Sequence, residues 1–294
     1  MKKTGFIAIV GRPNVGKSTL MNKILGEKVA IVSNKPQTTR NRIIGIHTAG
    51  ESQFVFLDTP GIHTPKDRLG DYMVKAADDT MREADAVVLV VDPGKPVSNV
   101  ERNVIDYIKE SGCGSVLVLN KTDLYRREQI AETIMAYSAL HDFDAVVPTC
   151  ARNGDKVDEL LDECAKFLTE SEWFFPGDIV TDQPERQIAA EIIREKLLRT
   201  LNKEVPHGIA VVIEEFKESD GLISIRAEIF CEKESHKRII VGKGGAGLKM
   251  VGTYARQDLE RLFGTRVYLN LWVKVKENWR DSLQTVANFG YKQE

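Results

Sequence analysis

The chain has 294 residues, of which 42% are hydrophobic and 29% are charged, so its composition is that of an ordinary globular protein and not of a disordered, collagen-like or coiled-coil chain. Its 41 basic and 43 acidic residues give a net charge of −2, which excludes binding of a polyanion through bulk charge alone. Four cysteines without a CxxC pair indicate reduced thiols and not a disulfide framework or a zinc site. The longest apolar run is too short to span a bilayer, so we expect a cytoplasmic protein, and the length predicts two domains.

Residues 1–170 alternate short apolar runs with amphipathic stretches. The runs have the length and composition of buried strands, and they are Phe6–Val10, Phe54–Leu57, Ala86–Val91, Val116–Leu119 and Ala145–Val147. The stretches between them have helical periodicity, and they lie near Lys17–Leu25, Tyr72–Glu83, Val100–Ser111, Glu128–Leu140 and Val157–Leu168. This alternation predicts a doubly wound α/β domain with a mostly parallel sheet, whose ligands bind beyond the carboxyl ends of the strands.

The periodicity breaks at residues 171–185, which we interpret as a linker. Residues 186–294 follow a different order, with the predicted elements helix Arg186–Asn202, strands Ile209–Phe216 and Leu222–Cys231, helix Leu248–Phe263, strand Arg266–Lys276 and a C-terminal helix within Trp279–Phe289. A glycine-rich loop precedes the helix that begins near Leu248. This order predicts a second, α+β domain.

The segment Gly11–Ser18 fits the pattern GxxxxGK[ST] and lies between a predicted strand and a predicted helix. The glycines let backbone N–H groups turn toward phosphate oxygens, and the helix N-terminus adds a partial positive charge. Lys17 can then reach the β- and γ-phosphates, and the Ser18 hydroxyl can ligate Mg²⁺. The alternative, a plain glycine turn, does not account for the strand–helix context. We expect nucleotide contacts from Gly11, Arg12, Pro13, Asn14, Val15, Gly16, Lys17, Ser18 and Thr19.

The sequence Asp58-Thr59-Pro60-Gly61 follows the second predicted strand. A carboxylate at this position can hold Mg²⁺ through a water, and Gly61 can offer its N–H to a γ-phosphate. Ile62, which immediately follows this motif, can neither orient a water nor donate a hydrogen bond. We therefore expect slow intrinsic hydrolysis, with another element positioning the water. We interpret His63, Arg40 and Arg42 as solvated switch residues.

The sequence Asn120-Lys121-Thr122-Asp123 follows the strand Val116–Leu119 and predicts the base. A carboxylate at Asp123 can accept hydrogen bonds from the N1–H and the exocyclic amine of guanine. Adenine has no donor at that ring nitrogen, and leaving the carboxylate unpaired costs on the order of 1–3 kcal/mol. The Lys121 stem can cover the base, and Asn120 can brace neighbouring loops. The sequence therefore predicts a guanine nucleotide, GTP or GDP.

The motifs GRPNVGKS, QTTR and DTPG, in this order, resemble those of the Era family of translation-factor-class GTPases. The resemblance implies that one of Thr38 and Thr39 meets Mg²⁺ when GTP is bound, and we favour Thr39. It also implies a fifth element that touches guanine O6 through its backbone and usually reads Ser-Ala. The matching stretch here is Thr149-Cys150-Ala151, so a cysteine replaces the serine. We expect Lys17, Thr39 and Gly61 to act in catalysis.

The resemblance further implies a second cation at Asn14, because related GTPases with asparagine at this loop position use it to hold K⁺ near the phosphates. Such a cation could offset charge that develops during phosphoryl transfer. The alternative is that Asn14 only caps the loop, since asparagine is common in such turns.

The window Lys233–Arg280 contains 11 basic and 4 acidic residues, a net charge of +7. It includes the GxxG loop Gly242–Gly245, and such a loop lets a sugar-phosphate chain approach while a groove beside it holds about four unpaired nucleotides. A plain turn and a solvated basic surface are the alternatives. The order of elements resembles a type II KH domain, so we expect RNA contacts from Lys237, Arg238, Gly242, Lys243, Gly244, Gly245 and Lys249, with Arg256 nearby.

One P-loop GTPase domain (1–170), one linker (171–185) and one KH domain with a C-terminal helix (186–294) match the Era family along nearly the whole chain. The resemblance implies a GTP-hydrolysing, Mg²⁺-dependent switch that binds the 3′ end of 16S rRNA and assists biogenesis of the 30S ribosomal subunit. It also implies a monomer with some peripheral association with the inner membrane. Two alternatives are a tRNA-modifying or other regulatory GTPase, and an RNA-binding protein whose nucleotide site is vestigial.

Overall fold

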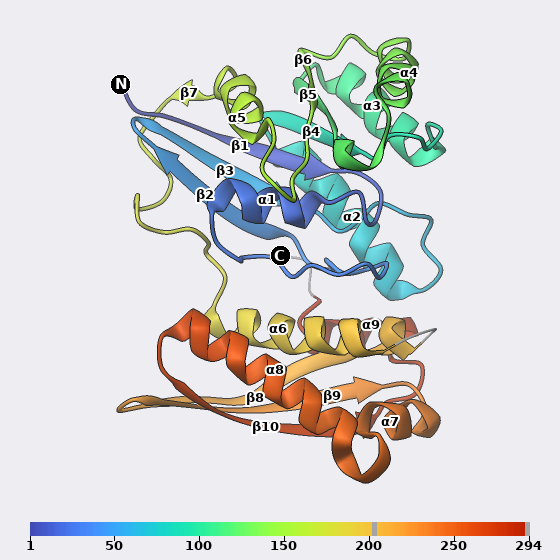
Figure 1. The fold of residues 1–294 in the computed structure, drawn as a ribbon, viewed down its shortest axis with the longest axis vertical. Coiled ribbons are helices and arrows are strands. Elements are labelled where there is room, and N and C mark those ends of the chain that lie inside the picture. Colours follow the sequence, from blue (N-terminus) through green and yellow to red (C-terminus); the bar gives the residue numbers. More distant parts are fainter. Residues whose placement is uncertain (202–204, 292–294) are drawn as a thin grey trace. The chain divides into compact units, whose positions relative to one another are not determined.

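The computed structural model describes residues 1–201 and 205–291, which form two compact units (Figure 1). The first unit comprises Met1–Ala30, Thr39–Pro65 and Gly70–Asp182. The second comprises Ile31–Thr38, Lys66–Leu69 and the described residues from Gln183 onward. Each unit has its own buried apolar core. In the described ranges, no helix combines the length and the apolar character that crossing a bilayer requires.

The first unit alternates strands and helices. Its strands are β1 (Lys3–Val10), β2 (Ile43–Ala49), β3 (Ser52–Asp58), β4 (Ala86–Val91), β5 (Gly114–Leu119), β6 (Ala145–Pro148) and β7 (Thr169–Glu170). Its helices are α1 (Lys17–Leu25), α2 (Arg68–Glu83), α3 (Asn99–Ser111), α4 (Arg127–Ser138) and α5 (Val157–Ala165), with a 3₁₀ turn at Thr122–Leu124. These elements confirm the predicted strand–helix alternation.

The sheet has the strand order β2-β3-β1-β4-β5-β6, and β7 pairs with β1. Strand β2 runs antiparallel to β3 and β7 antiparallel to β1, while the other neighbouring pairs are parallel. One face packs against α1 and α5, and the other packs against α2, α3 and α4. The parallel strands therefore end at one edge of the sheet, where the loops that follow β1, β3, β4, β5 and β6 meet.

Strands β2 and β7 are elements that sequence periodicity did not predict. Gly45 interrupts β2, and glycine weakens a strand pattern because it has no side chain to pack. Tertiary contact explains this glycine, since a Cβ there would lie 2.8 Å from the Leu25 side chain on α1. Strand β7 has only two residues, both exposed, so it lacks any apolar signal.

The second unit has the order of a type II KH domain. Its elements are α6 (Glu185–Thr200), β8 (Ala210–Ser219), β9 (Leu222–Cys231), α7 (Glu234–Val241), α8 (Ala246–Phe263), β10 (Arg266–Val275) and α9 (Leu283–Asn288), with 3₁₀ turns at Val205–Gly208, Lys243–Gly245 and Trp279–Asp281. The sheet order is β10-β9-β8, with β9 parallel to β10 and antiparallel to β8. Helices α6 and α8 lie on one side of this sheet (Figure 1), where their apolar residues form the core.

Two details of the second unit differ from the sequence prediction. Helix α7 has only eight residues and was not predicted as a separate helix. The predicted C-terminal helix is divided into a 3₁₀ turn at Trp279–Asp281 and the six-residue α9. Trp279 is fully buried and its Nε1 donates to the Gly208 carbonyl at 3.0 Å, so its ring is a core residue. The predicted last residue of the first KH helix, Asn202, lies outside the described residues.

The second unit also holds the segments 31–38 and 66–69. Buried Glu195 of α6 accepts a hydrogen bond from the Val32 N–H at 3.1 Å. Buried Arg194 donates to the carbonyls of Gln37 and Thr38. The segment 31–38 is thus held at both ends by side chains of one helix.

Candidate nucleotide-binding site and nucleic-acid interface

The phosphate loop lies between β1 and α1, at the edge where the parallel strands end. Its backbone has positive φ at Gly11, Asn14 and Gly16. Lys17 is buried, and its Nζ donates to the carbonyls of Gly11 and Arg12, both at 3.1 Å. Burial lowers the pKa of Lys17 to about 8, although the nearby Asp58 carboxylate opposes this shift. Backbone carbonyls of the phosphate loop itself therefore bind the lysine ammonium.

Three oxygen-bearing side chains meet beside the loop. The Ser18 hydroxyl donates to Asp58 Oδ2 at 2.7 Å and lies 2.9 Å from the Thr39 hydroxyl, which is itself 3.5 Å from the same carboxylate oxygen. Asp58 is fully buried, and burial raises its pKa to about 6, against the opposing effects of Lys17, Ser18 and Thr39. By contrast, the Thr38 hydroxyl donates to the Lys35 carbonyl at 2.6 Å. The structure thus brings Thr39, and not Thr38, to Ser18 and Asp58.

The loop after Asp58 packs closely against the phosphate loop. A Cβ at Gly61 would lie 2.8 Å from the backbone of Pro13, so only glycine fits at this position without displacing the loop. The Ile62 N–H donates to the Gly11 carbonyl at 3.2 Å. The Thr59 hydroxyl donates to the Ile9 carbonyl of β1 at 2.9 Å, and Pro60 is buried. These contacts place the backbone of Gly61 directly beside the phosphate loop.

Asn120 connects three loops at the ends of β1, β5 and β6. Its Nδ2 donates to the Val15 carbonyl at 2.8 Å, and its Oδ1 accepts from the Ala151 N–H at 2.9 Å. The Thr149 hydroxyl lies 3.5 Å from the same oxygen. The Val15 side chain is buried in the core, so only its backbone faces the loop. This geometry agrees with the bracing function predicted for Asn120.

Lys121 crosses to the phosphate loop. Its Nζ donates to the Asn14 carbonyl at 2.6 Å and to Asp92 Oδ2 at 2.9 Å. The Tyr125 hydroxyl donates to Asp92 Oδ1 at 2.6 Å. Burial acts to raise the pKa of Asp92, but the hydrogen bonds from Tyr125 and Lys121 outweigh it and lower the pKa. Sequence reasoning missed Asp92, although it directly follows β4 and so resembles Asp58, the last residue of β3.

Asp123 lies in the 3₁₀ turn Thr122–Leu124, and its carboxylate is exposed toward solvent. The thiol of buried Cys150 donates to Asp123 Oδ1 at 3.1 Å. The Thr122 hydroxyl donates to the Thr149 carbonyl at 3.0 Å, which joins the two loops a second time. The cysteine that replaces the usual serine therefore supports the acidic side chain directly.

An ion pair joins the phosphate loop to α3. The Arg12 guanidinium is 2.7 Å from Oε1 of fully buried Glu101, whose Oε2 accepts from the Ser98 N–H at 2.8 Å. Fully buried Tyr137 of α4 adjoins this pair, and burial together with Glu101 raises its pKa. Glu101 belongs to the capping box of α3, which is visible in the sequence as the pattern Ser-x-x-Glu. Its pairing with Arg12 is a tertiary contact without a local signal.

The residues that we interpreted as solvated switch residues differ from one another. Arg40 is 1% exposed, so that interpretation is wrong for this side chain. Arg42 forms an ion pair with Glu83 of α2. The ring Nδ1 of His63 lies 2.9 Å from the Gly61 carbonyl, so His63 is held beside the phosphate loop.

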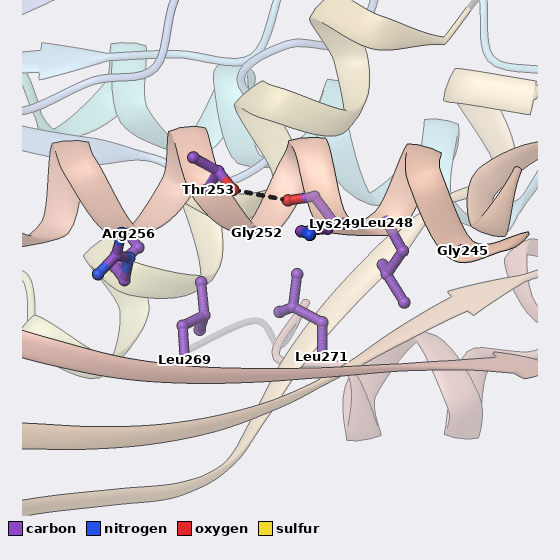
Figure 2. Close-up of a pocket in the computed structure, with 8 residues that line it drawn as sticks. All are labelled: Gly245, Leu248, Lys249, Gly252, Thr253, Arg256, Leu269 and Leu271. Carbon is purple, nitrogen blue, oxygen red and sulfur yellow. Dashed lines mark hydrogen bonds between the residues drawn. The ribbon is translucent and has the colours of Figure 1, made fainter.

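The second unit has a groove of about 330 Å³ between α8 and β10 (Figure 2). It is lined by Gly245, Leu248, Lys249, Gly252, Thr253, Arg256, Leu269 and Leu271. The Thr253 hydroxyl donates to the Lys249 carbonyl at 2.9 Å. The groove thus has an apolar floor and basic side chains on one wall, a composition that suits bases and phosphates together.

Of the predicted RNA-binding residues, Gly245 and Lys249 line this groove. Gly242, Lys243 and Gly244 form the turn at its end, and the three glycines of the loop all have positive φ, which glycine adopts without strain. Lys237 and Arg238 lie on the adjacent helix α7. Sequence reasoning missed the two leucines of β10, Leu269 and Leu271. The alternation of apolar and polar residues along a strand predicts only that they lie in the core.

Two family models match the chain. One described as "50S ribosome-binding GTPase" matches residues 6–121, and one described as "KH domain" matches residues 204–280. Full-length relatives are also similar. GTPase Era of Alkaliphilus metalliredigens is 48% identical over 99% of this chain and 99% of its own length. GTPase Era of Clostridium botulinum (strain Okra) is 49% identical over the same shares.

Solved structures of Era proteins are also similar to this chain along its whole length. A variant of Aquifex aeolicus Era bound to GDP·AlF4⁻ has a TM-score of 0.95 and 41% identity, covering 99% of this chain and 100% of that one. Era in complex with MgGDPNP and nucleotides 1506–1542 of 16S ribosomal RNA has a TM-score of 0.96 and 41% identity, covering 100% of both chains. The similarity extends through both units and nearly the full length, and the chain therefore belongs to the Era family of GTPases.

Proposed function

We propose that this chain is a GTP-hydrolysing switch that binds the 3′ end of 16S rRNA and assists biogenesis of the 30S ribosomal subunit. One observation carries the proposal: a GxxG turn and an apolar groove with basic side chains occur in the same chain as a guanine-nucleotide site. A relative of 41% identity binds both MgGDPNP and a 16S rRNA segment, which supports the same pair of ligands here. Crosslinking the protein to RNA in cells and sequencing the bound fragments tests the partner, because fragments from elsewhere, such as tRNA, contradict it.

We propose the following roles at the nucleotide. The phosphates contact the residues of the phosphate loop and its continuation, Gly11, Arg12, Pro13, Asn14, Val15, Gly16, Lys17, Ser18 and Thr19. The nucleotide contacts Asp58, Thr59, Pro60, Gly61 and Ile62 at its γ-phosphate end. The base contacts Asn120, Lys121, Thr122, Asp123, Thr149, Cys150 and Ala151. Among these, Lys17 supplies charge to the phosphates and Gly61 supplies a backbone N–H, and Thr39 contributes its hydroxyl to the hydrolytic site.

We propose that Ser18 and Thr39 hold Mg²⁺ directly and that Asp58 holds it through a water. The donors are two hydroxyls and a carboxylate, an all-oxygen set that suits this ion. Within the described residues, Asp58 Oδ1 is a buried oxygen without a hydrogen-bond partner, so the site has an acceptor left over. When bound, Mg²⁺ neutralises charge on the β- and γ-phosphates. Because Ile62 cannot orient a water, we also propose slow intrinsic hydrolysis.

The pKa of Lys17 predicts how nucleotide affinity depends on pH. In the ligand-free site this pKa is about 8, so the ammonium is charged at pH 7 and mostly neutral at pH 9. Phosphates bind the charged form, so we expect GDP affinity to fall as pH rises, by about tenfold between pH 7 and pH 9. Titration with GDP in EDTA, at fixed ionic strength, measures this change without the metal.

The matched control for this pH dependence is Lys17→Arg. The guanidinium stays charged throughout the range, so this variant should lack the lysine contribution to the slope even if it binds GDP more weakly. Any titration of the guanine base is common to both proteins and cancels in their comparison. Equal slopes for the two proteins would show that Lys17 does not titrate in this range.

We propose that K⁺ activates hydrolysis through Asn14. This residue is exposed on the loop, has a left-handed backbone and has its carbonyl bonded to Lys121. A cation beside the phosphates stabilises developing charge, so we expect hydrolysis to be on the order of 10- to 100-fold faster in KCl than in NaCl of equal ionic strength. In Asn14→Ala the two rates should become equal. Equal rates in the wild-type protein would remove the proposal and leave Asn14 with a structural function in the loop.

We propose that RNA contacts Lys237, Arg238, Gly242, Lys243, Gly244, Gly245 and Lys249, together with the groove between α8 and β10. We also propose that the GTPase module spans residues 1–170 and the KH module residues 186–294, with 171–185 between them. Finally, we propose that the protein is a monomer in the cytoplasm and that a small fraction of it associates weakly with the inner membrane. These last features rest on the family resemblance alone.

A further inference from the structure

Strand β10 has one face that lines the groove and a second face that carries exposed aromatic side chains. Leu269 and Leu271 point from the strand toward α8, where they line the groove (Figure 2). Tyr268 and Trp272 are 60% and 58% exposed. Because successive side chains of a strand project to opposite faces, these two lie on the face away from the groove. β10 is an edge strand, so a chain leaving the groove across this edge would reach them.

Large aromatic side chains are usually covered, and a third aromatic residue of this face is covered by the chain itself. The strand register places Phe230 of β9 beside Lys274, on the same face as Trp272. The ring of Phe289 stacks on Phe230 with a centroid separation of 4.5 Å. Within the part of the chain that the structure describes, no ring covers Tyr268 or Trp272. The uncovered part of the face therefore coincides with the strand that borders the groove.

The charges on this face favour an anionic partner. Strand β10 contains Arg266 and Lys274 and no acidic residue. By strand register, the same face of the whole sheet carries the basic residues Lys217, Arg226, Arg266 and Lys274 and the acidic residues Glu215 and Glu228. Both acidic residues form ion pairs, Glu215 with Lys217 and Arg226, and Glu228 with Lys274. Arg266 forms no ion pair among the described residues. The face thus combines flat aromatic rings with a basic excess.

We infer that Tyr268 and Trp272 form a second RNA-binding surface, on which bases of an RNA that leaves the groove stack. The inference rests on the proposed RNA-binding function and extends it. A KH groove holds about four nucleotides, so a longer RNA continues beyond it. Aromatic rings stack any base, because every base has a π-face, and nearby basic side chains neutralise the phosphates. This combination favours single-stranded RNA over an apolar or acidic protein partner.

The spacing of the two rings also defines what they can hold. They are four residues apart on one strand, which corresponds to about 13 Å. Neighbouring stacked nucleotides of one strand are only about 3.4 Å apart. Tyr268 and Trp272 therefore accept two bases that are not stacked on each other, as in an extended single strand. A duplex presents no such separated base faces.

The test compares a long with a short RNA. The probes are a twelve-nucleotide RNA with the 3′-terminal sequence of 16S rRNA and the four-nucleotide segments within it. In Tyr268→Ala/Trp272→Ala, we expect the affinity for the twelve-nucleotide RNA to fall at least tenfold, while the best four-nucleotide segment binds as to wild type. Met135→Ala, which removes a 64% exposed apolar side chain from α4, is the control for general surface effects. Thermal unfolding checks that each variant is folded.

Tryptophan fluorescence provides an independent readout. Trp272 is the most exposed of the three tryptophans, since Trp173 is half-buried and Trp279 is fully buried. We expect the twelve-nucleotide RNA to quench the emission of the wild-type protein. Trp272→Phe keeps an aromatic ring, so it should bind this RNA with nearly wild-type affinity and lose the quenching. Quenching that persists in Trp272→Phe would contradict stacking on this residue.

The outcomes separate the two proposals. If four-nucleotide segments bind and the double variant keeps full affinity for the twelve-nucleotide RNA, the second surface is wrong and the groove stands. If the wild-type protein binds neither RNA, the proposed function is wrong and the second surface is wrong with it. If sedimentation shows a dimer that the double variant abolishes, with unchanged RNA affinity, the face binds a second copy and the inference is overturned.

Discussion

Replacing Asp123 by asparagine should change the preferred nucleotide from GTP to xanthosine triphosphate. The carboxylate accepts from two donors of guanine, N1–H and the exocyclic amine. An amide presents a donor of its own against that amine, so we expect GTP affinity to fall about 10²- to 10⁴-fold. Xanthine has a carbonyl in place of the amine, which can accept from the new amide. Its affinity should rise, and competition between the two nucleotides for one site measures the exchange.

The structure defines the control for this experiment. Asp123 is exposed and its only described side-chain partner is the Cys150 thiol, so the isosteric change should leave the fold intact. Asp162→Asn makes the same change on an exposed position of α5 and should bind GTP as the wild type does. Unchanged preference for GTP in Asp123→Asn would show that another group reads the base. It would also remove the physical argument for a guanine site.

The sequence predicted the parts of the site that depend on one strand and the loop that follows it. Asn120 and Asp58 come directly after apolar runs, and carboxyl ends of parallel strands meet at one sheet edge, so their proximity to the phosphate loop follows from the pattern. The doubly wound sheet was predicted in the same way, and so was the order of the elements in the second unit apart from α7. Both depend on periodicity within short segments, which the sequence contains directly.

Contacts between distant segments could not be predicted in this way. Glu101 reads as a helix cap, and nothing local shows that its second oxygen meets Arg12. In the sequence, Cys150 only replaces the usual serine of the Ser-Ala element. Its hydrogen bond to Asp123 becomes visible only when β5 and β6 are paired in the sheet. Such pairs depend on which buried polar groups the finished fold brings together, because each must find a partner away from water.

The segment 31–38 is the clearest example of a contact between distant segments that could not be predicted from the sequence. Its sequence position assigns it to the GTPase domain, whereas the structure includes it in the second unit. The segment bonds to Arg194 and Glu195, two charged residues of α6. Both are buried because they bond to backbone groups of the segment. Charge in a helix is therefore a poor guide to exposure when a neighbouring loop offers unpaired carbonyls and N–H groups.

Acidic substitutions in the GxxG turn should abolish RNA binding without unfolding the protein. The turn lies at the end of the groove, where a sugar-phosphate chain would come closest to the backbone. Lys243→Asp/Gly244→Asp changes the local charge by three units and directs two carboxylates at the phosphates. We expect RNA affinity to fall by roughly 100-fold or more at physiological salt, with a smaller dependence on salt concentration. Filter binding across a salt series measures both quantities.

The fold should tolerate this change, and the chain contains a matched control for it. Gly244 has φ 60°, a Cβ added there would meet no atom within 4 Å, and aspartate is among the residues that accept a left-handed backbone. Gly112 at the end of α3 has φ 64° and is equally open, with Lys109 three residues before it. Lys109→Asp/Gly112→Asp therefore makes the same pair of substitutions, with the same change in charge, in the first unit. If both double variants lose RNA to the same extent, net charge is the cause and the GxxG turn has no direct contact; if only the first loses it, and GTP hydrolysis is unchanged in both, the RNA meets the protein at this turn.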